Sequence, residues 1–480
     1  MESLLEILKG IQTVVWGPLT IFLLLAVGFY YTIRLKGVSI TAFPKAVRYI
    51  FEKEEGQGDV SAFASLCTAL AATIGTGSIV GVATALRTGG PGALFWMWVS
   101  ALLGMATKYA EGVLAVKYRT VDENGNIAGG PMYYIEKGLG KNWKWLACLF
   151  SVFGVITALL GCGTFPQVNA IVESTHNAFH VPVIVIGGVL TILTACVILG
   201  GVRSISRVAE VVVPVMAILY VLTALVLLVL HASALPGAFR SIFQAAFTPR
   251  AVGGGVAGTA VISVMTAMRT GIARGVYTNE AGLGSSPIIA AAAKTKSPVR
   301  QGLISMTGVF FTTIVICTMT ALVILSSGLL ETSSYDGGIL SNYAFNQGLP
   351  GNTGMYLVSI GLIFFSFTTI IGWNYYGERC LVYLSGNTRL VFGYRILYIA
   401  CIAAAPFLSL EPIWYLADIT NALMAFPNLV GLLLLSPVVI RETRAYFQKE
   451  GVKNIHGYSR ISEKAGGFTY TGKWEREENS

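Results

Sequence analysis

Residues 71–79 read Ala71-Ala72-Thr73-Ile74-Gly75-Thr76-Gly77-Ser78-Ile79, and this stretch decides the fold. It lies within an apolar segment long enough to cross a membrane. Two glycines one residue apart disfavour a continuous helix, because each costs about 1 kcal/mol relative to alanine. In a bilayer an interrupted helix is tolerated only where its freed backbone groups face a ligand, water or protein. The stretch therefore predicts a broken membrane helix whose N–H and C=O groups hold a solute and an ion.

The composition places this stretch in a polytopic membrane protein. Of 480 residues, 54% are hydrophobic and only 12% are charged, whereas soluble domains average about 25% charged residues. The net charge of +9 would suggest nucleic acid in a soluble protein, but here the basic residues lie mostly in loops and the tail, so no nucleic-acid partner is expected. The seven cysteines form no Cys-x-x-Cys pair, and neither a disulfide framework nor a metal site of that kind is expected. No cleavable leader is expected either, since the first apolar run has no basic segment before it.

A window of about 20 apolar residues per membrane crossing gives eleven predicted spans. The fourth is interrupted at 161–166. The seventh is too long for one straight helix and is expected to be interrupted at 269–275, which reads Arg-Thr-Gly-Ile-Ala-Arg-Gly. The spans are about 13–34, 60–87, 91–117, 144–175, 181–200, 208–231, 253–293, 301–326, 354–383, 390–408 and 412–440.

Charge counting orients these spans. With the N-terminus outside, 25 of the 33 Lys and Arg residues fall in inside segments, four in outside segments and four within spans. This bias agrees with the positive-inside rule. We therefore expect the N-terminus outside, and the polar tail after Ile440 to be cytosolic and partly disordered.

The two spans with glycine-rich interruptions, the second and the seventh, lie five spans apart. This spacing is typical of two inverted five-helix halves that each begin with a discontinuous helix. The alternative is that these glycines allow close helix packing, but packing glycines are spaced four apart. We predict an extra N-terminal helix and connecting loop at 1–59, a first repeat at 60–231, a second repeat at 232–440 and a tail at 441–480.

Four motifs resemble the alanine or glycine:cation symporter family. They are Ala-Ala-Thr-Ile-Gly-Thr-Gly at 71–77, Gly-Gly-Pro-Met-Tyr-Tyr at 129–134, Arg-Gly-Val-Tyr-Thr-Asn-Glu-Ala-Gly-Leu-Gly-Ser at 274–285 and Gly-Trp-Asn-Tyr-Tyr-Gly-Glu at 372–378. The resemblance covers about residues 10–440. It implies an all-α, 5+5 inverted-repeat (LeuT-like) fold with one extra N-terminal helix. It also implies import of small neutral amino acids with sodium across a prokaryotic cell membrane.

The residues themselves predict a cation site. The carbonyls of Ala71 and Ile74 end the first half-helix, where the helix dipole is partially negative and hard oxygen atoms suit a small cation. In the ninth span Phe365, Thr368 and Thr369 recur at i, i+3 and i+4 and share a face. Together they give five neutral oxygen ligands, which favours a monovalent ion over calcium or magnesium. The alternative is that both threonines bond back to their own helix.

The same break predicts a substrate site. Its residues are Thr73, Gly75, Thr76, Gly77 and Ser78, and the amides of Thr76 and Gly77 point out of a helix N-terminus, which favours a carboxylate. Thr369 is expected to contact the substrate as well as the cation. Beyond the break, the resemblance implies that Gln167 lies beside the substrate. Trp373, one turn beyond Thr369, would limit the side chain to the size of alanine or glycine, unless it only packs.

The seventh span holds further candidates. We expect Met265, Arg269 and Gly271 to face the first break, with the backbone of 269–271 contacting the substrate amine. Arg274 and Glu280 are expected to form an ion pair in a gate or scaffold. We further expect Lys108 to pair with Glu111, three residues away, and Asn169 to bond between helices.

The leading hypothesis is a sodium-coupled importer of alanine or glycine. One departure concerns Ser78, where the family usually has asparagine, which puts a second cation site or the usual substrate in doubt. Thr164 also replaces a residue that is often asparagine. The alternatives are proton coupling through Glu111, Glu280 or Asp418, and a channel. An enzyme is not expected, because the sequence has no HExxH, GxSxG or P-loop motif.

Overall fold

The computed structural model describes residues 2–248, 250–252, 260–262, 264–408 and 411–449. The chain begins with α1 (Glu2–Val15) and α2 (Pro18–Arg34), which together form a long apolar stretch over Leu5–Arg34. Two short helices follow, α3 (Val38–Thr41) and α4 (Phe43–Phe51). In the predicted division of the chain, these helices belong to the part that precedes the first repeat.

The predicted break in the second span is confirmed. Helix α5 (Ala62–Thr73) starts at Ser61, whose Oγ accepts a hydrogen bond from the amide of Ala64 at 3.0 Å. The chain resumes as a π-helical turn, η1 (Gly77–Gly81), and continues as α6 (Val82–Gly89). The two halves are bent by 53°.

The remaining helices of the first half surround this broken span. They are α7 (Gly92–Lys117), α9 (Lys144–Leu160), α10 (Phe165–Phe179), α11 (Val183–Ile198) and α12 (Gly201–Leu230). The interruption between α9 and α10 falls at 161–164, as the sequence predicts. Between α7 and α9 lie an antiparallel pair, β1 (Thr120–Val121) with β2 (Ile127–Ala128), then α8 (Pro131–Leu139) and the turn η2 (Lys141–Trp143).

The second half begins with η3 (Ala232–Ala234), α13 (Leu235–Phe247) and a short antiparallel pair, β3 (Arg250–Val252) with β4 (Ala260–Ile262). Helix α14 (Val264–Asn279) is continuous, and the break precedes α15 (Ser286–Ala291). The interruption therefore lies at 280–285 and not at 269–275, where we expected it. Its backbone is left-handed at Glu280 (φ 55°), Gly282 (φ 87°) and Gly284 (φ 83°), and glycine alone adopts this region without cost. Part of the expected start of this span, residues 253–259 and 263, lies outside the described residues.

The last helices run α16 (Pro298–Val309), the π-helical η4 (Phe310–Cys317), α17 (Thr318–Ser327), α18 (Leu329–Thr332), α19 (Gly337–Asn346), α20 (Thr353–Ser385), α21 (Leu390–Ala404), the turn η5 (Ala405–Phe407), α22 (Glu411–Leu434) and α23 (Ser436–Lys449). The expected eleventh span, 412–440, thus ends at Leu434. The polar tail starts within a helix, α23, which buries Val439 and Phe447, and only its residues 450–480 lie outside the described ones.

The protein is a polytopic, mostly helical membrane protein. Among the described residues, eight helices are long and apolar enough to cross a membrane, and the bent α5–α6 pair raises the number to nine. Helix α11 is apolar but shorter, and α14 with α15 forms the second broken segment. A total of eleven spans stays a prediction.

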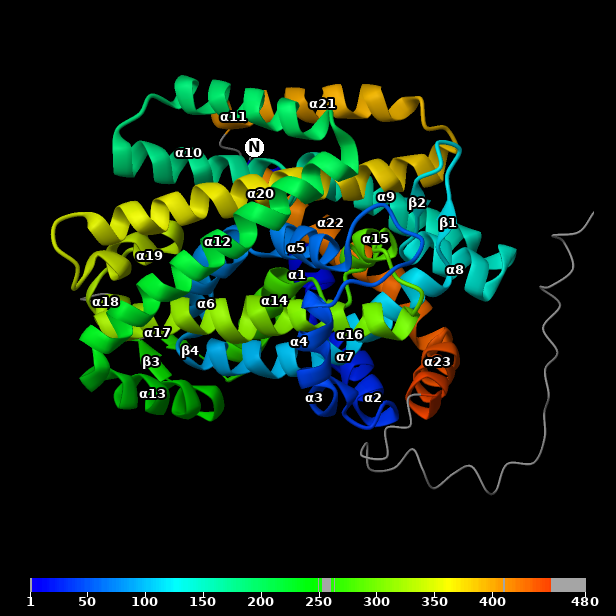
Figure 1. Cartoon of the computed structure of the whole chain (residues 1–480). Coiled ribbons are helices and arrows are strands. Elements are labelled where there is room, and N and C mark those ends of the chain that lie inside the picture. Colours follow the sequence, from blue (N-terminus) through cyan, green and yellow to red (C-terminus); the bar gives the residue numbers. More distant parts are fainter. Residues whose placement is uncertain (1, 249, 253–259, 263, 409–410, 450–480) are drawn as a thin grey trace, which may run out of the picture.

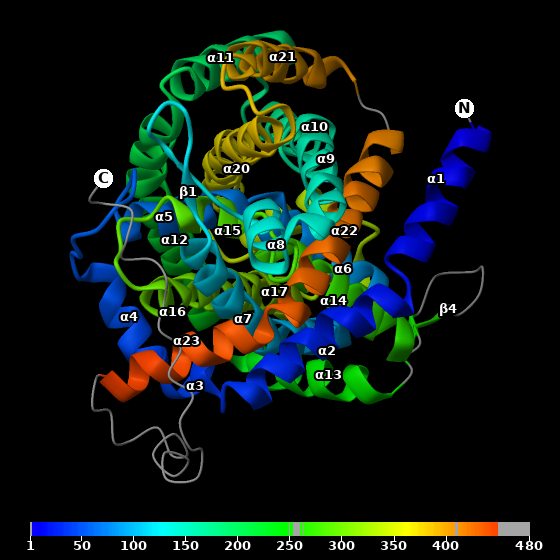
Figure 2. The same cartoon turned by 90° about the vertical axis from the view of Figure 1, so that its right-hand side faces the viewer.

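The long helices run roughly parallel (Figure 1), with α18 and α19 at one end and α8, the β1–β2 pair and α23 at the other. Two segments predicted to be cytosolic, the connection that holds the β1–β2 pair and α8 and the start of the tail in α23, thus lie at the same end. Figure 2 shows α11 and α21 together at the periphery, beside α12. These helices expose large apolar side chains such as Ile184, Val211 and Phe392, as expected for surfaces that face lipid.

Candidate substrate and cation site

The break between α5 and η1 meets α20 and α10 at Gly75. A Cβ on Gly75 would lie 2.5 Å from Thr369 Oγ1 and 3.0 Å from Gln167 Oε1. Only a hydrogen atom fits, because no side chain tolerates contacts this short. The structure therefore brings together three residues that the sequence predicted for one site, from three separate helices.

Oxygen atoms of α5 and α20 gather beside this corner. The Thr369 hydroxyl lies 2.8 Å from the carbonyl oxygen of Ala71 and 3.0 Å from that of Phe365. The Thr368 hydroxyl donates to the same Phe365 carbonyl at 2.9 Å. Both threonines therefore bond back to their own helix, as the alternative held, but Thr369 also reaches across to α5. Ile74, the fifth predicted ligand, is buried at the end of α5.

Gln167 holds the start of the resumed helix. Its Oε1 accepts a hydrogen bond from the Thr76 amide at 3.3 Å, and its Nε2 donates to Thr76 Oγ1 at 3.1 Å. The same Nε2 donates to the carbonyl of Cys162, in the break between α9 and α10, at 3.2 Å. One amide side chain thus joins two interrupted spans.

The other predicted residues of the break are more enclosed. Thr73 Oγ1 bonds back to the carbonyls of Ala69 and Leu70 at 3.0 and 3.1 Å. Ser78 is fully buried, and its carbonyl accepts a hydrogen bond from Thr320 Oγ1 at 3.0 Å. Both positions therefore hold the backbone of the break against neighbouring turns.

A cavity of about 250 Å³ reaches the break from the side of α6 and α14. Its lining includes Tyr277, which sequence reasoning missed because it considered only the charged and glycine residues of this span. A Cβ on Gly77 would lie 2.9 Å from the Tyr277 ring. The residues around the cavity are Thr76, Gly77, Val80, Gly81, Thr84, Arg274 and Tyr277.

Three predicted residues of α14 lie away from the break. Gly271 faces α7, where an added Cβ would be 2.3 Å from the carbonyl oxygen of Ala93. Met265, 59% exposed, and Arg269 line an outer cavity of about 360 Å³. The proposed amine contact from the backbone of 269–271 was wrong, because α14 is helical there and its break comes about ten residues later.

We expected Arg274 to pair with Glu280. In the structure it pairs instead with Asp418 of α22. Its guanidinium lies 3.6 Å from Asp418 Oδ2 and stacks over the Tyr277 ring. The same Asp418 oxygen accepts a hydrogen bond from Gln12 Nε2 at 2.7 Å, and the Trp16 indole donates to the Asp418 carbonyl at 3.0 Å. The extra N-terminal segment is thereby tied to the outer wall of the site.

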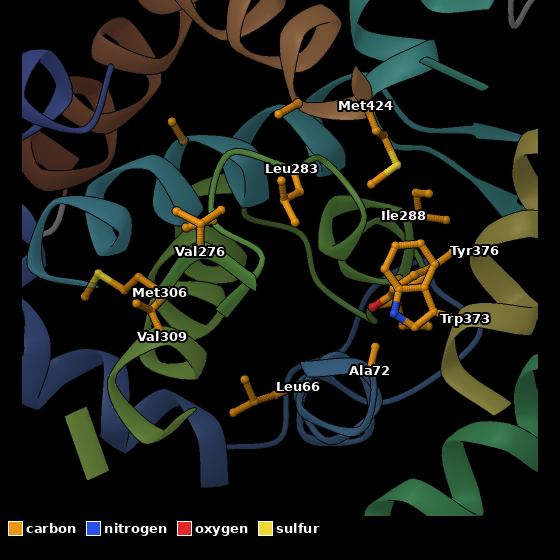
Figure 3. Packing of buried hydrophobic residues seen from close by; sticks show 14 of the residues in the cluster. Leu66, Ala72, Val276, Leu283, Ile288, Met306, Val309, Trp373, Tyr376 and Met424 are labelled. Carbon is orange, nitrogen blue, oxygen red and sulfur yellow. The ribbon is translucent and has the colours of Figure 1, made fainter. Parts of the chain in front are cut away.

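Trp373 is not among the residues that line this cavity. It is 1% exposed, packs edge-on against Tyr376 with ring centroids 5.5 Å apart, and leaves no room for a side chain at Gly163. Figure 3 shows Trp373 and Tyr376 together, with Ala72 of α5 below them. The Trp373 side chain also lies beside the Glu280 carboxylate. Packing is therefore part of its role, as the alternative held.

Comparison with known proteins identifies the family of this chain. The family model described as the sodium:alanine symporter family matches residues 1–458. The chain belongs to the sodium:alanine symporter family. An uncharacterized transporter of Haemophilus influenzae is 54% identical over 445 residues, covering 92% of this chain and 96% of its own length. The sodium/alanine symporter AgcS of Methanococcus maripaludis is 46% identical over 459 residues, covering 94% and 99%.

A crystal structure of MhsT in complex with L-phenylalanine confirms the predicted fold of this family member. It aligns with a TM-score of 0.56 at 12% identity, over 81% of this chain and 99% of that chain. The protein is thus a helical membrane transporter with the LeuT-like fold.

On the side away from the cavity, this symporter-family chain is closed by backbone pairing. Val60, before α5, forms a parallel bridge with Ala293, after α15. The Arg119 guanidinium donates at 2.8–2.9 Å to four carbonyl groups of the same two segments, those of Gln57, Ala291, Ala293 and Thr295. The ends of the two broken spans are therefore fastened together at the predicted cytosolic side.

Proposed function

We propose that this protein is a sodium-coupled symporter that imports small neutral amino acids, alanine and glycine, by alternating access. The observation that carries the proposal is the corner at Gly75, where Thr369 and Gln167 meet the broken helix. No organic cofactor is needed, because coupling requires only that the ion and the solute bind next to each other.

The sodium ion would be held by neutral oxygens alone. Its proposed ligands are the carbonyls of Ala71, Ile74 and Phe365 and the hydroxyls of Thr368 and Thr369. These atoms are hard donors without formal charge, which suits a monovalent cation better than a divalent one. The two carbonyls of α5 also lie at the partially negative end of their helix.

The amino acid would lie on the other side of the break. Its carboxylate would accept hydrogen bonds from the amides of Thr76 and Gly77 and from Gln167, at a helix N-terminus. Tyr277 and Trp373 would limit the space for its side chain. The names of relatives support both coupled ions and more than one solute, since Bacillus subtilis has a probable sodium/glutamine symporter at 36% identity and a putative sodium/proton-dependent alanine carrier at 34%.

The direction of access follows from the two sides of the break. The cavity beside Tyr277 and Arg274 opens on one side, while Arg119 closes the other. With the N-terminus outside, this arrangement faces outward in the membrane of a prokaryotic cell. Alternating access would then require release of the fastening between the segments before α5 and after α15.

Uptake of labelled alanine and glycine into proteoliposomes tests the proposal. We expect accumulation with an inward sodium gradient, and none with a proton gradient alone or with no gradient. Accumulation driven equally by protons would replace sodium by proton coupling. Fluxes far above carrier rates that never exceed equilibrium would show a channel.

A glycine substitution tests the site. Gly75→Ala places a methyl group against Thr369 Oγ1 and Gln167 Oε1, so we expect uptake to be lost in a folded protein. Gly188→Ala in α11 is the matched control, because nothing lies within 4 Å of its added Cβ. Normal sodium-driven uptake by Gly75→Ala would show that the site lies elsewhere.

A further inference from the structure

Three buried charged side chains surround the break between α14 and α15. Lys108 and Glu111 come from α7, and Glu280 from the break itself; their residues are 3%, 1% and 3% exposed. Ionised groups at membrane depth are costly unless they are neutralised. One ammonium and two carboxylates leave this cluster, which we call the hinge cluster, with one uncompensated negative charge.

The two α7 residues bind backbone groups at the start of this break, which acts as a hinge, and within it. Lys108 Nζ donates to the carbonyl of Asn279, the last residue of α14, at 2.8 Å. Glu111 Oε1 accepts hydrogen bonds from the Gly282 amide at 3.1 Å and from Asn428 Nδ2 at 2.6 Å. The expected direct bond between Lys108 and Glu111 is thus replaced by separate backbone contacts, although Lys108 lies within electrostatic reach of Glu111 and of Glu280.

Glu280 faces other donors. Its Oε2 accepts a hydrogen bond from Ser285 Oγ at 2.5 Å, and the Trp373 side chain lies beside the same carboxylate. Its backbone is left-handed, with φ of 55°. A non-glycine residue holds this conformation only where its surroundings fix it, so the Glu280 side chain is part of the hinge.

The remaining titratable groups bring no positive charge. Those within electrostatic reach of the two carboxylates are Tyr31 and Tyr134 beside Glu111, and Tyr376 and Cys162 beside Glu280. All four are neutral in their protonated forms. Lys108 is therefore the one basic group that acts on this pair among the described residues.

We infer that the hinge cluster is a proton-binding site, in which one of the two carboxyl groups, Glu111 or Glu280, carries a bound proton. A proton neutralises the excess charge and changes no bond other than the new O–H. A metal cation fits less well, because Glu111 Oε1 and Glu280 Oε2 already accept hydrogen bonds from N–H and O–H donors, which repel a cation. Glu111 Oε2 accepts no hydrogen bond within the described part of the chain. The inference goes beyond sodium coupling and holds whichever ion drives transport.

The position of the cluster gives the proton a consequence. Lys108 binds the Asn279 carbonyl at the end of α14, and Glu111 binds the Gly282 amide within the hinge. Glu280 itself lies within the hinge. Loss of the proton at alkaline pH would leave a second buried carboxylate opposed by a single ammonium. We therefore expect the hinge to be destabilised, and transport to fall, as the pH rises.

Infrared difference spectroscopy on the purified full-length protein tests the proton directly. A protonated buried carboxyl has its own C=O stretching band, which disappears when the group ionises. We expect one such band in the wild type, and its loss in Glu280→Gln or in Glu111→Gln. Lys108→Met removes the one counter-charge, so the band should double as both carboxyl groups become neutral. No band in the wild type, or one that survives both glutamine substitutions, would overturn the inference.

The pH dependence of uptake provides a second readout. Wild-type uptake at saturating sodium should decline at alkaline pH, whereas Glu280→Gln, which stays neutral, should decline less. Glu442→Gln is the matched control, because Glu442 forms a partly exposed pair with Lys117 on α7. The same profile in Glu280→Gln and wild type would also overturn the inference. If Glu280→Gln fails to fold, Glu111→Gln provides the same comparison.

Discussion

At the scale of single residues, the site depends on the absence of a side chain at Gly75 as much as on the side chains around it. Gly75 leaves the space in which Thr369 Oγ1 approaches the carbonyls of Ala71 and Phe365. A hydroxyl has one proton to donate, so it can satisfy one of these carbonyls at a time. The other keeps a lone pair free for a cation, which is why a threonine is suited to this position.

Removal of this hydroxyl tests the cation site. Thr369→Val keeps the shape but removes one proposed ligand, so the half-saturating sodium concentration in alanine uptake should rise by about tenfold for a loss of about 1.4 kcal/mol. Thr223→Val on α12 is the control, because its hydroxyl bonds only to the Leu219 carbonyl of its own helix. An unchanged sodium dependence in Thr369→Val would remove Thr369 from the site.

Trp373 tests the selection of side-chain size. Trp373→Ala should admit larger amino acids, so leucine should gain relative to alanine as a competitor of labelled alanine uptake. Alanine itself should bind more weakly, by about 0.8 kcal/mol for each methylene group that the indole no longer shields from water. Trp373→Phe is the control, since it keeps an aromatic ring at this position but removes the indole N–H. An unchanged rank order in Trp373→Ala at matched expression would show that Trp373 only packs.

At the scale of helices, close approach sets how α14 packs against α7. Gly271 faces Ala93 and Trp96, and Gly275 faces Ser100 Oγ, at distances that exclude a Cβ. Small residues let membrane helices approach closely, so that dispersion forces hold them together. These glycines therefore serve packing, while the hinge glycines Gly282 and Gly284 serve backbone conformation.

A single methyl group should separate these roles. Gly271→Ala forces its Cβ against the Ala93 carbonyl and should lower the stability of the folded protein by about 1–3 kcal/mol. Gly393→Ala in α21 has open space and should be neutral or slightly stabilising, since alanine favours a helix. Thermal unfolding in detergent compares the two variants. Equal unfolding temperatures for the two variants would show that α14 and α7 have room for a methyl group at Gly271.

The fastening by Arg119 makes a prediction about helix ends. Arg119→Gln removes most of four charge-assisted hydrogen bonds to the segments before α5 and after α15. A loss of about 2 kcal/mol corresponds to about a 30-fold shift toward an open cytosolic side. Hydrogen exchange of residues 57–61 and 290–296 should accelerate, whereas Arg48→Gln, which breaks an exposed i,i+4 pair with Glu52, should leave it unchanged. Equal protection from exchange in both variants would show that Arg119 does not hold these two segments together.

At the scale of the whole molecule, the distribution of Lys and Arg residues predicts the orientation in the membrane. The segments with most Lys and Arg lie at the end of the bundle that carries α8, the β1–β2 pair and α23. We expect protease added to intact cells to spare a tag at Ser480 and to remove one at Met1. Permeabilised cells are the control, in which both tags should be removed. Cleavage at Ser480 in intact cells would reverse the topology.

Several features follow from the sequence because they depend on local chemistry. Apolar runs and basic loops determine that the chain crosses a membrane repeatedly, and Gly75 and Gly77 determine where the second span breaks. The i, i+3, i+4 spacing places Phe365, Thr368 and Thr369 on one face. These predictions do not depend on which helices pack against the segment, since glycine residues weaken a helix wherever it lies in the fold.

Tertiary structure alone decided which residues meet. The seventh span breaks at Glu280 and not near Gly271, because glycines in contact with α7 remain helical while those at 282 and 284 adopt left-handed backbone. Arg274 pairs with Asp418 rather than Glu280 because α22 supplies a carboxylate across the cavity. Charge partners and cavity walls come from helices far apart in sequence, and their choice depends on the packing of the whole bundle.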